Sequence, residues 1–440
     1  MRTLARAPMT GGVRSGIVSA ARAGPRTVFV LTVAFSLGGV AQPLTLDQAL
    51  SEARARNASL PVAREDAALA SSVADEARAQ RYPRFDLAGE LQLARPGMYA
   101  ESFAFAKLLG AYTLFDAGKR GAELRAALSD YSRATAGVRK SEADLDLEVR
   151  TRFDELTELD EELAARSDGV ARLVHYVTLL EERRAGGEGG NADLLKTRAR
   201  ALSDQATIEA LRRSRSTAAR ELDDLMGRDP DQPIVPTAPP LPSIPAETVV
   251  TAWEHAPDLS EASAALAVAQ ERRSAAASER WPRLELRAEV GGILPLLGSN
   301  LDAVNVPTAP GAGFGAAMGL TLSFPIFDFG AISARIAQAE AAARRAQAGL
   351  DLTRRRTRLQ WAAAHADLDS LIRELALRQR HEPAAKDAYL ASEALYRGGA
   401  GTGLEVLDAY TEWIDSEVKL VQARQSLRDA QARVLRWEGQ

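Results

Sequence analysis

The sequence predicts an α+β membrane protein built from two tandem repeats, each with two transmembrane β-strands and a long α-helical coiled-coil hairpin. Three observations lead to this fold class. Short motifs occur twice in the same order, period-two alternation follows a proline in each copy, and long charged helices with a narrow apolar stripe come next. The 440 residues are rich in Ala, Leu, Arg and Glu and only 5 % aromatic, a composition that favours helices.

Residues 1–41 have the features of an export signal. Five arginines without an acid precede an apolar segment at 28–37, and Gly39-Val40-Ala41 offers a small-residue cleavage site. Removal of this segment takes the formal net charge from −4 to −9, which makes the mature chain a poor candidate for binding nucleic acid. No later stretch is apolar enough for a transmembrane helix, so we expect any membrane crossing to use strands.

Three motifs establish the internal repeat. The segment Arg81-Tyr82-Pro83-Arg84 recurs as Arg280-Trp281-Pro282-Arg283. The other two motifs recur after a spacing that is longer by 13 residues, which indicates one net insertion between about 291 and 313. These are Leu114-Phe115-Asp116-Ala117-Gly118 with Ile326-Phe327-Asp328-Phe329-Gly330, and Arg184 to Leu195 with Tyr396 to Leu407.

The repeats span 42–229 and 247–440, and a proline-rich linker joins them at 230–246. In each repeat we expect a first helix, continuous over 46–81 in the first copy, then two strands and a hairpin. The expected strands are 84–94 and 101–115, then 283–294 and 313–327, and the hairpins are 119–226 and 331–437.

Alternation identifies one polar face and one apolar face on the strands. The apolar positions are Phe85, Leu87, Leu91 and Leu93 in the first repeat, and Leu284, Leu286, Ala288 and Val290 in the second. Beyond each Phe-Asp-x-Gly segment the apolar spacing becomes helical, in steps of three, four or seven. This stripe predicts a coiled-coil contact along the first hairpin, through Leu145, Val149, Phe153, Leu156, Leu163, Val170, Val174 and Val177.

Four strands are too few to close a membrane-spanning barrel, which takes about eight. Open strand edges would leave backbone groups unpaired in lipid. The chain is therefore expected to combine its strands with those of other copies around a cyclic axis, with the helices continuing the tube.

The motifs at Ile326–Gly330 and from Tyr396 through Gly399 to Glu405-Val406-Leu407-Asp408-Ala409, with their order and duplication, resemble the outer membrane efflux protein (TolC) family. The resemblance covers nearly all of the chain beyond the signal. It implies a homotrimer with a twelve-stranded barrel among outer-membrane lipids and a helical periplasmic tunnel. It further implies an exit duct of a tripartite efflux or type I secretion system. Such a duct conducts substrate passively from a periplasmic adaptor and an inner-membrane transporter.

The resemblance also suggests roles for residues at the far end of the hairpins. It places Glu405 and Asp408 in the pore, where three copies would form two rings of carboxylates that attract cations. It makes Asp193 and Tyr396 a latch that holds the tip shut by hydrogen bonds between hairpins. A basic partner found in some members falls at Gly401 here, and Arg397 is the nearest substitute. Gly186, Gly187, Gly398 and Gly399 would form the turns that contact the adaptor.

Each of these residues also has a purely structural interpretation. The two acids can be solvated helix residues, Asp193 can favour a helix N-terminus, and Tyr396 can be a packing residue. Asp116 and Asp328 fit capped bends better than catalytic acids. No cysteine, Gly-x-Ser-x-Gly motif or paired histidine indicates an enzyme, a cofactor or a metal site. The alternative function is a periplasmic coiled-coil adaptor or scaffold.

Overall fold

The structure is a computed structural model that describes residues 43–92, 103–187, 190–230, 233–241, 252–295 and 313–438. The predicted export signal at 1–41, the last two residues of the strand predicted at 84–94, and the end of the linker lie outside the described residues. Residues from Pro43 onward form one unit.

The same series of elements occurs twice in this unit. The first comprises α1 (Leu46–Arg56), α2 (Ser59–Ala79), β2 (Arg84–Gln92), β3 (Phe103–Phe115), α3 (Lys119–Ala185) and α4 (Asn191–Leu225). The second comprises α5 (Pro257–Ser278), β5 (Arg283–Pro295), β6 (Gly313–Ser323), α6 (Ala331–Arg397) and α7 (Gly403–Glu438). Both α3 and α6 contain 67 residues, a length of about 100 Å at the rise of an α-helix.

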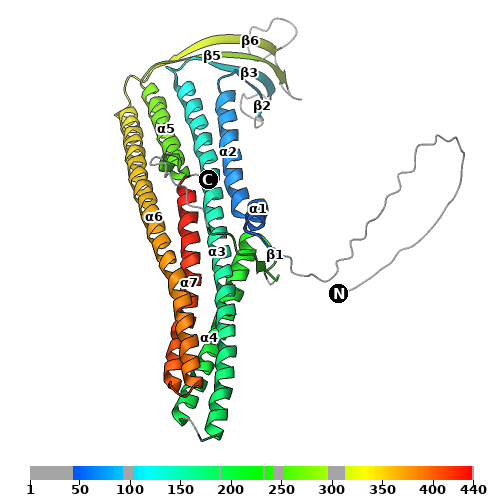
Figure 1. Ribbon diagram of the computed structural model, residues 1–440. Coiled ribbons are helices and arrows are strands. Elements are labelled where there is room, and N and C mark those ends of the chain that lie inside the picture. Colours follow the sequence, from blue (N-terminus) through cyan, green and yellow to red (C-terminus); the bar gives the residue numbers. More distant parts are fainter. Residues whose placement is uncertain are drawn as a thin grey trace, which may run out of the picture. The chain divides into compact units, whose positions relative to one another are not determined.

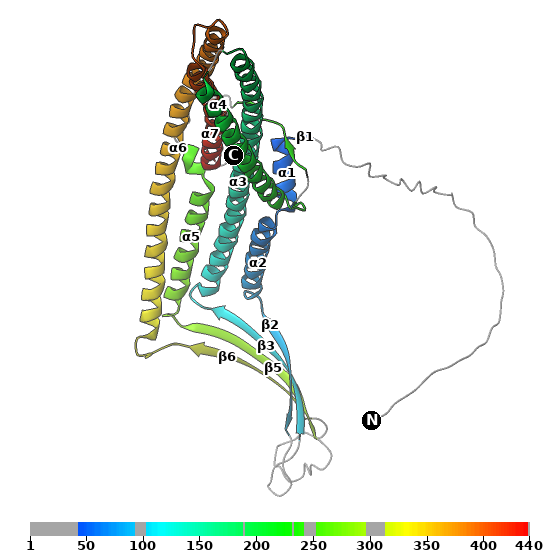
Figure 2. The same cartoon turned by 90° about the horizontal axis from the view of Figure 1, so that it is seen from below.

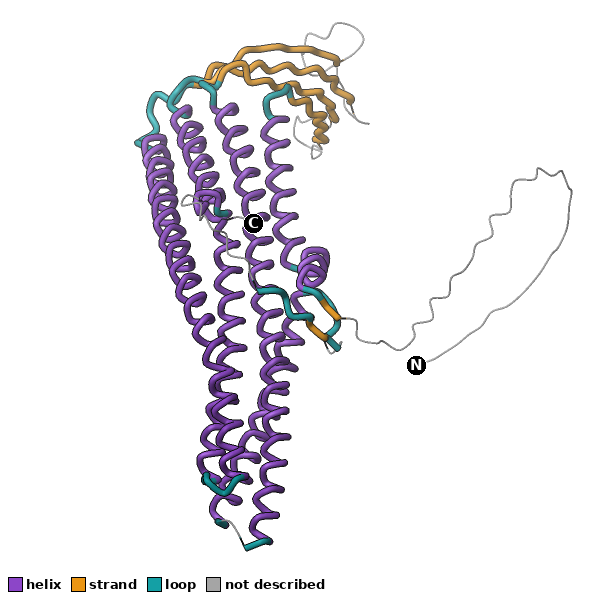
Figure 3. The backbone as a smooth tube through the Cα atoms, viewed as in Figure 1, coloured by secondary structure: helices purple, strands orange, loops and turns teal. Residues whose placement is uncertain are grey.

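The helices form one layer that meets the strands at one end (Figures 1 and 2). Near the strands α2, α3, α5 and α6 lie side by side in that order. Toward the opposite end α4 returns along α3, and α7 returns along α6 (Figure 3). Among the described helices, none is both long and apolar enough to cross a lipid bilayer.

The first helix is interrupted, contrary to the continuous helix expected over 46–81. The chain leaves the helix at Asn57, whose backbone is extended, and restarts at Ser59. The Asn57 side chain donates a hydrogen bond to the Leu225 carbonyl at 2.9 Å and accepts one from the Ser59 backbone N–H at 2.8 Å. An asparagine can compete for backbone groups in this way, so it ends one helix and begins the next.

The four strands form an antiparallel sheet in the order β2-β3-β5-β6. Its register gathers the alternating apolar residues on one face, because Leu87 pairs with Leu108, and Leu108 with Val290. The gap that Gly110 leaves in this face is covered from the next strand, because the Phe85 ring comes within 3.2 Å of the Gly110 Cβ position. The face is open, with Leu87 80 % and Met318 78 % exposed. A surface this apolar suits lipid or another protein surface better than water.

The opposite face of the sheet is charged. Arg84 and Asp86 form an ion pair at 2.8 Å along β2, and Arg287 and Glu285 form one at 3.0 Å along β5. A sheet with one apolar and one charged face can separate a nonpolar medium from an aqueous one.

Each repeat passes from strand to helix through a bend that an aspartate caps, as predicted. Asp116 accepts a hydrogen bond from the Gly118 N–H at 3.1 Å, and Asp328 accepts one from the Gly330 N–H at 3.0 Å. The strand β6 ends at Ser323, earlier than the expected 327, because Pro325 has no N–H to donate to a sheet.

The predicted apolar stripe on α3 is confirmed near the middle of the helix and holds only in part toward the tip, where Val177 packs against an apolar cluster and Val174 does not. Leu145, Val149, Phe153 and Leu156 are buried. Farther on, Val174 is 52 % exposed, and Leu173, Tyr176 and Leu180 are buried instead. Buried positions recur after 11 residues, as from Leu145 to Leu156 and from Ala165 to Tyr176. An α-helix drifts by about 20° in each seven-residue repeat, so a heptad pattern loses its face over this length.

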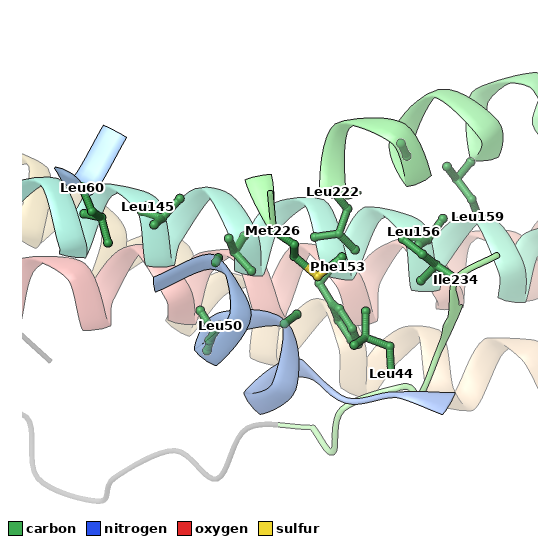
Figure 4. Close-up of a cluster of buried hydrophobic side chains, with 14 residues drawn as sticks. Leu44, Leu50, Leu60, Leu145, Phe153, Leu156, Leu159, Leu222, Met226 and Ile234 are labelled. Atoms are coloured by element: carbon green, nitrogen blue, oxygen red, sulfur yellow. The ribbon is translucent and has the colours of Figure 1, made fainter. Parts of the chain in front are cut away.

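The linker between the repeats packs against the first hairpin. The short strands β1 (Pro43–Leu44) and β4 (Val235–Pro236) pair in parallel, and Ile234 is buried beside them. Leu44, Leu50, Phe153 and Met226 belong to the same apolar cluster (Figure 4). The start of the chain's first repeat and the linker thus form one layer over α3 and α4.

A cluster of buried and half-buried acids lies where α3 contacts α7. Asp154 and Arg428 form an ion pair at 3.0 Å, with side chains only 4 % and 6 % exposed. Burial raises the pKa of Asp154 to about 6, against the opposing effect of Arg428. Burial and the neighbouring Glu162 and Asp429 raise the pKa of Glu158 to about 7. Burial and Asp154 likewise raise the pKa of Asp429 to about 7.

The folded protein should therefore lose stability as the pH rises. A carboxyl whose pKa is raised in the folded state stabilises the fold when protonated, and this contribution is lost as pH passes the folded pKa near 7. We expect the apparent Tm in detergent to fall from about pH 4.5, near the ordinary carboxyl pKa, to about pH 7, and to level off above that pH. The double variant Glu158→Gln with Asp429→Asn should make the Tm depend less on pH. The control variant Glu148→Gln, at an exposed position of α3, should leave the pH dependence of the Tm unchanged. If the Tm of the double variant fell with pH as steeply as that of the wild type, these two carboxyls would not be the source of the pH dependence.

Candidate functional site

The candidate site is the end of the helical layer farthest from the strands, where the two hairpin turns lie (Figures 1 and 3). Both turns use a left-handed glycine, with φ of 83° at Gly187 and 82° at Gly399. In the second turn the Ala400 N–H donates to the Leu395 carbonyl and the Gly399 N–H to the Tyr396 carbonyl. This is a Schellman motif, which satisfies the last carbonyls of α6. Gly186 and Gly398 precede the left-handed residues and cap α3 and α6.

Asp193 lies in the first turn of α4, where its charge suits the helix dipole. It is half-buried against the first residue of α7. A Cβ atom on Gly403 would come within 2.7 Å of the Asp193 Oδ2 atom. Glycine at 403 therefore lets the two return helices begin in direct contact, a role that the sequence analysis did not assign to it.

Tyr396 is buried, but it does not bond directly to Asp193 in the described part of the chain. Its ring packs edge-on against Tyr176 with centroids 5.6 Å apart, and the Arg183 guanidinium lies 4.6 Å from the Tyr396 centroid. Burial, with the nearby Tyr396 and Asp193, raises the pKa of Tyr176. Tyr176 thus lies close to both residues of the predicted latch.

Glu405 and Asp408 are both exposed, on the first two turns of α7. Glu405 also has a local role, because its Oε2 accepts the Thr402 N–H at 2.9 Å while the Thr402 Oγ1 accepts the Glu405 N–H at 3.3 Å. This reciprocal pair is a capping box. The Thr402-x-x-Glu405 spacing makes it visible in the sequence, although the sequence analysis did not identify it.

Gly401 has little room for a side chain. A Cβ there would lie 3.1 Å from the Tyr396 backbone nitrogen and 3.3 Å from the Leu395 Cβ. The suggested substitute, Arg397, pairs with Glu393 on its own helix at 2.6 Å. Arg183 of α3 reaches the second turn instead, where it donates a hydrogen bond to the Arg397 carbonyl at 2.7 Å.

An aromatic core supports the tip from within. Tyr389 stacks on Trp413 at 5.2 Å, and Arg172 lies 4.4 Å from the Trp413 centroid. Tyr410 donates to Asp204 at 3.4 Å, which joins α7 to α4. Among the described residues, no three acidic or histidine side chains are grouped so as to hold a metal ion.

Comparison with known proteins assigns this fold to a family. The outer membrane efflux protein family model matches residues 49–228 and 248–440. The outer membrane efflux protein BepC of Brucella suis is 23 % identical over 316 residues, which cover 70 % of this chain and 66 % of BepC. Protein CyaE of Bordetella pertussis is 27 % identical over 334 residues, which cover 72 % of this chain and 67 % of CyaE.

Among solved structures, CusC, which is described as forming a transmembrane channel, matches the fold with a TM-score of 0.80 at 19 % identity. The match covers 89 % of this chain and 91 % of CusC. The chain belongs to the outer membrane efflux protein family. It is a protein of the Gram-negative outer membrane with a helical periplasmic part.

If Asp193 and Tyr396 restrain the tip, Asp193→Ala combined with Tyr396→Phe should raise single-channel conductance in planar bilayers. The substitutions remove the charge beside Gly403 and the hydroxyl of a buried tyrosine, while the aromatic packing is kept. Arg212→Ala is a suitable control, because Arg212 pairs with Glu209 on the exposed side of the same return helix. Conductance equal to that of the wild type would remove both residues from any role in the aperture.

Proposed function

We propose that this chain is one subunit of a homotrimeric exit duct. The duct passively conducts substrate to the exterior from a periplasmic adaptor and an inner-membrane transporter of a tripartite efflux or type I secretion system. Membership of the family and the description of BepC as an outer membrane efflux protein support this function.

The observation that carries the proposal is that the subunit has two different open edges. In the sheet these are β2 and β6, each paired on one side only within the described strands. In the helical layer they are α2 and α6. Both helices carry exposed apolar rows, Val62, Leu69 and Val73 on α2, and Leu352, Leu359 and Leu377 on α6.

Unlike edges favour head-to-tail contact between copies, which gives a ring when the rotation closes. In a trimer, β6 of one copy would pair with β2 of the next, giving a closed sheet of twelve strands. The same rotation would bring α6 beside α2 and cover both apolar rows. A closed sheet leaves no backbone edge unpaired, as lipid requires.

The two faces of the sheet suit this arrangement. The apolar face with Leu87 and Met318 would contact outer-membrane lipid, and the charged face with Asp86, Glu285 and Arg287 would line the water-filled interior. A periplasmic adaptor or scaffold, the alternative function, has no use for an open apolar sheet face of this kind.

At the periplasmic end we assign the pore lining to Glu405 and Asp408, which are exposed and three residues apart on α7. Three copies would give two rings of three carboxylates. Gly186, Gly187, Gly398 and Gly399 occupy the turns that an adaptor would contact.

The test is conduction by the purified wild-type protein in planar bilayers. We expect discrete, cation-selective current steps that divalent cations block, because acidic rings concentrate cations. Glu405→Ala with Asp408→Ala should retain the steps and lose both the selectivity and the block. Glu412→Ala, at an exposed position farther along α7, is the matched control. An inactive wild-type protein would contradict the duct, and unchanged reversal potentials in the double variant would contradict the rings.

A further inference from the structure

Two side chains of α3 connect the first hairpin to the second hairpin's turn, and neither belongs to the predicted latch. They are Tyr176 and Arg183, seven residues apart and therefore on one side of the helix. Tyr176 is buried and Arg183 is half-buried. Their contacts reach the end of α6 and the start of α7, the segment that carries the two aperture acids.

Arg183 holds the end of α6 in two ways. Its Nη2 donates to the Arg397 carbonyl at 2.7 Å, and its guanidinium lies 4.6 Å from the centroid of the Tyr396 ring. Carbonyls in the last turn of a helix lack partners in that helix, so a cation is favourable there. The planar guanidinium can donate a hydrogen bond and lie over a ring at the same time, which an ammonium group does less well.

Tyr176 contacts both sides of the second turn. Its ring packs against Tyr396 at 5.6 Å, and its hydroxyl donates to the Gly403 carbonyl at 3.4 Å. Gly403 is the first residue of α7 and precedes Glu405 by two residues. Gly403 also lies against Asp193 of the first hairpin, whose Oδ2 would be 2.7 Å from a Cβ at position 403. The start of α7 is thus enclosed by side chains of α3 and α4 of the same chain.

We propose that Arg183 and Tyr176 are positioning residues that fasten the α6–α7 turn to the first hairpin within one subunit. In this way they set the place of Glu405 and Asp408 in the aperture, an inference that presupposes the duct proposed above. Arg183 supplies, from inside the subunit, the cation that the family resemblance led us to expect near Gly401. Movement of the acidic rings then requires either that these contacts break or that both hairpins of a subunit move together.

The first experiment compares single-channel currents of Arg183→Ala, Tyr176→Phe and the wild type. Tyr176→Phe keeps the ring packing and loses only the hydrogen bond to Gly403. We expect both variants to increase conductance and to reduce cation selectivity, although Glu405 and Asp408 are retained. Arg198→Ala is the matched control. Arg198 pairs with Glu181 inside the first hairpin, so this substitution removes one positive charge and breaks no contact between the hairpins. Wild-type selectivity in both α3 variants would overturn the proposal.

The second experiment uses the absence of cysteine from the chain. A Cβ on Gly403 would lie 3.0 Å from the Asp193 Cβ, close enough for Asp193→Cys with Gly403→Cys to form a disulfide after a small adjustment. We expect a crosslink within one subunit, seen as a faster monomer band on a non-reducing denaturing gel. It should lower the conductance of the oxidised protein, and a reductant should reverse the loss.

The outcomes separate this inference from the proposed function. Crosslinked dimers, or free thiols in the oxidised protein, would overturn fastening within the subunit whether or not the protein conducts. A wild-type protein without channel activity would contradict the duct, while the gel would still test the contact. Conductance that does not differ between the oxidised and reduced double variant would overturn the positioning role.

Discussion

The two edges of the four-stranded sheet, which pair with no other described strand, constrain the rest of the structure. Strands β2 and β6 each offer a row of backbone donors and acceptors, and the face between them is apolar and open. A single copy can satisfy neither feature in lipid. The bends capped by Asp116 and Asp328 lead from β3 into α3 and from β6 into α6, while α2 and α5 lead into β2 and β5. The order of the strands is therefore also the order of these helices. The need to pair the edges of the sheet therefore determines how the helices of neighbouring copies meet as well.

The sequence predicts most of this architecture because its strongest signals are local or duplicated. Alternation at Leu284 to Val290 shows the two faces of a strand, and the repeated Phe-Asp-x-Gly motif marks the bend where a strand becomes a helix. Proline punctuation sets helix and strand ends to within a few residues. The exception is Asn57, where a contact with the distant Leu225 carbonyl accompanies a break that helix propensity alone would not suggest.

The tip could be located from the sequence, but its contacts could not. The stripe expected through Val174 turns away from the partner helix over the length of α3, and Tyr176 takes the buried place. Arg183 resembles any other charged residue of a charged helix, and only the fold brings it to the Arg397 carbonyl. Gly403 looks like one of several turn glycines until Asp193 is seen against it. Such contacts join residues more than 200 positions apart, which no local pattern encodes.

We propose that the unlike edges of neighbouring copies close head to tail around a three-fold axis. Native mass spectrometry of the detergent-solubilised full-length protein measures this most directly, because it counts the copies in each assembly. Closure as described predicts a single species that contains three copies of the mature chain. A stable species of one or two copies would contradict it, because a closed sheet of twelve strands requires three copies of the four-stranded sheet.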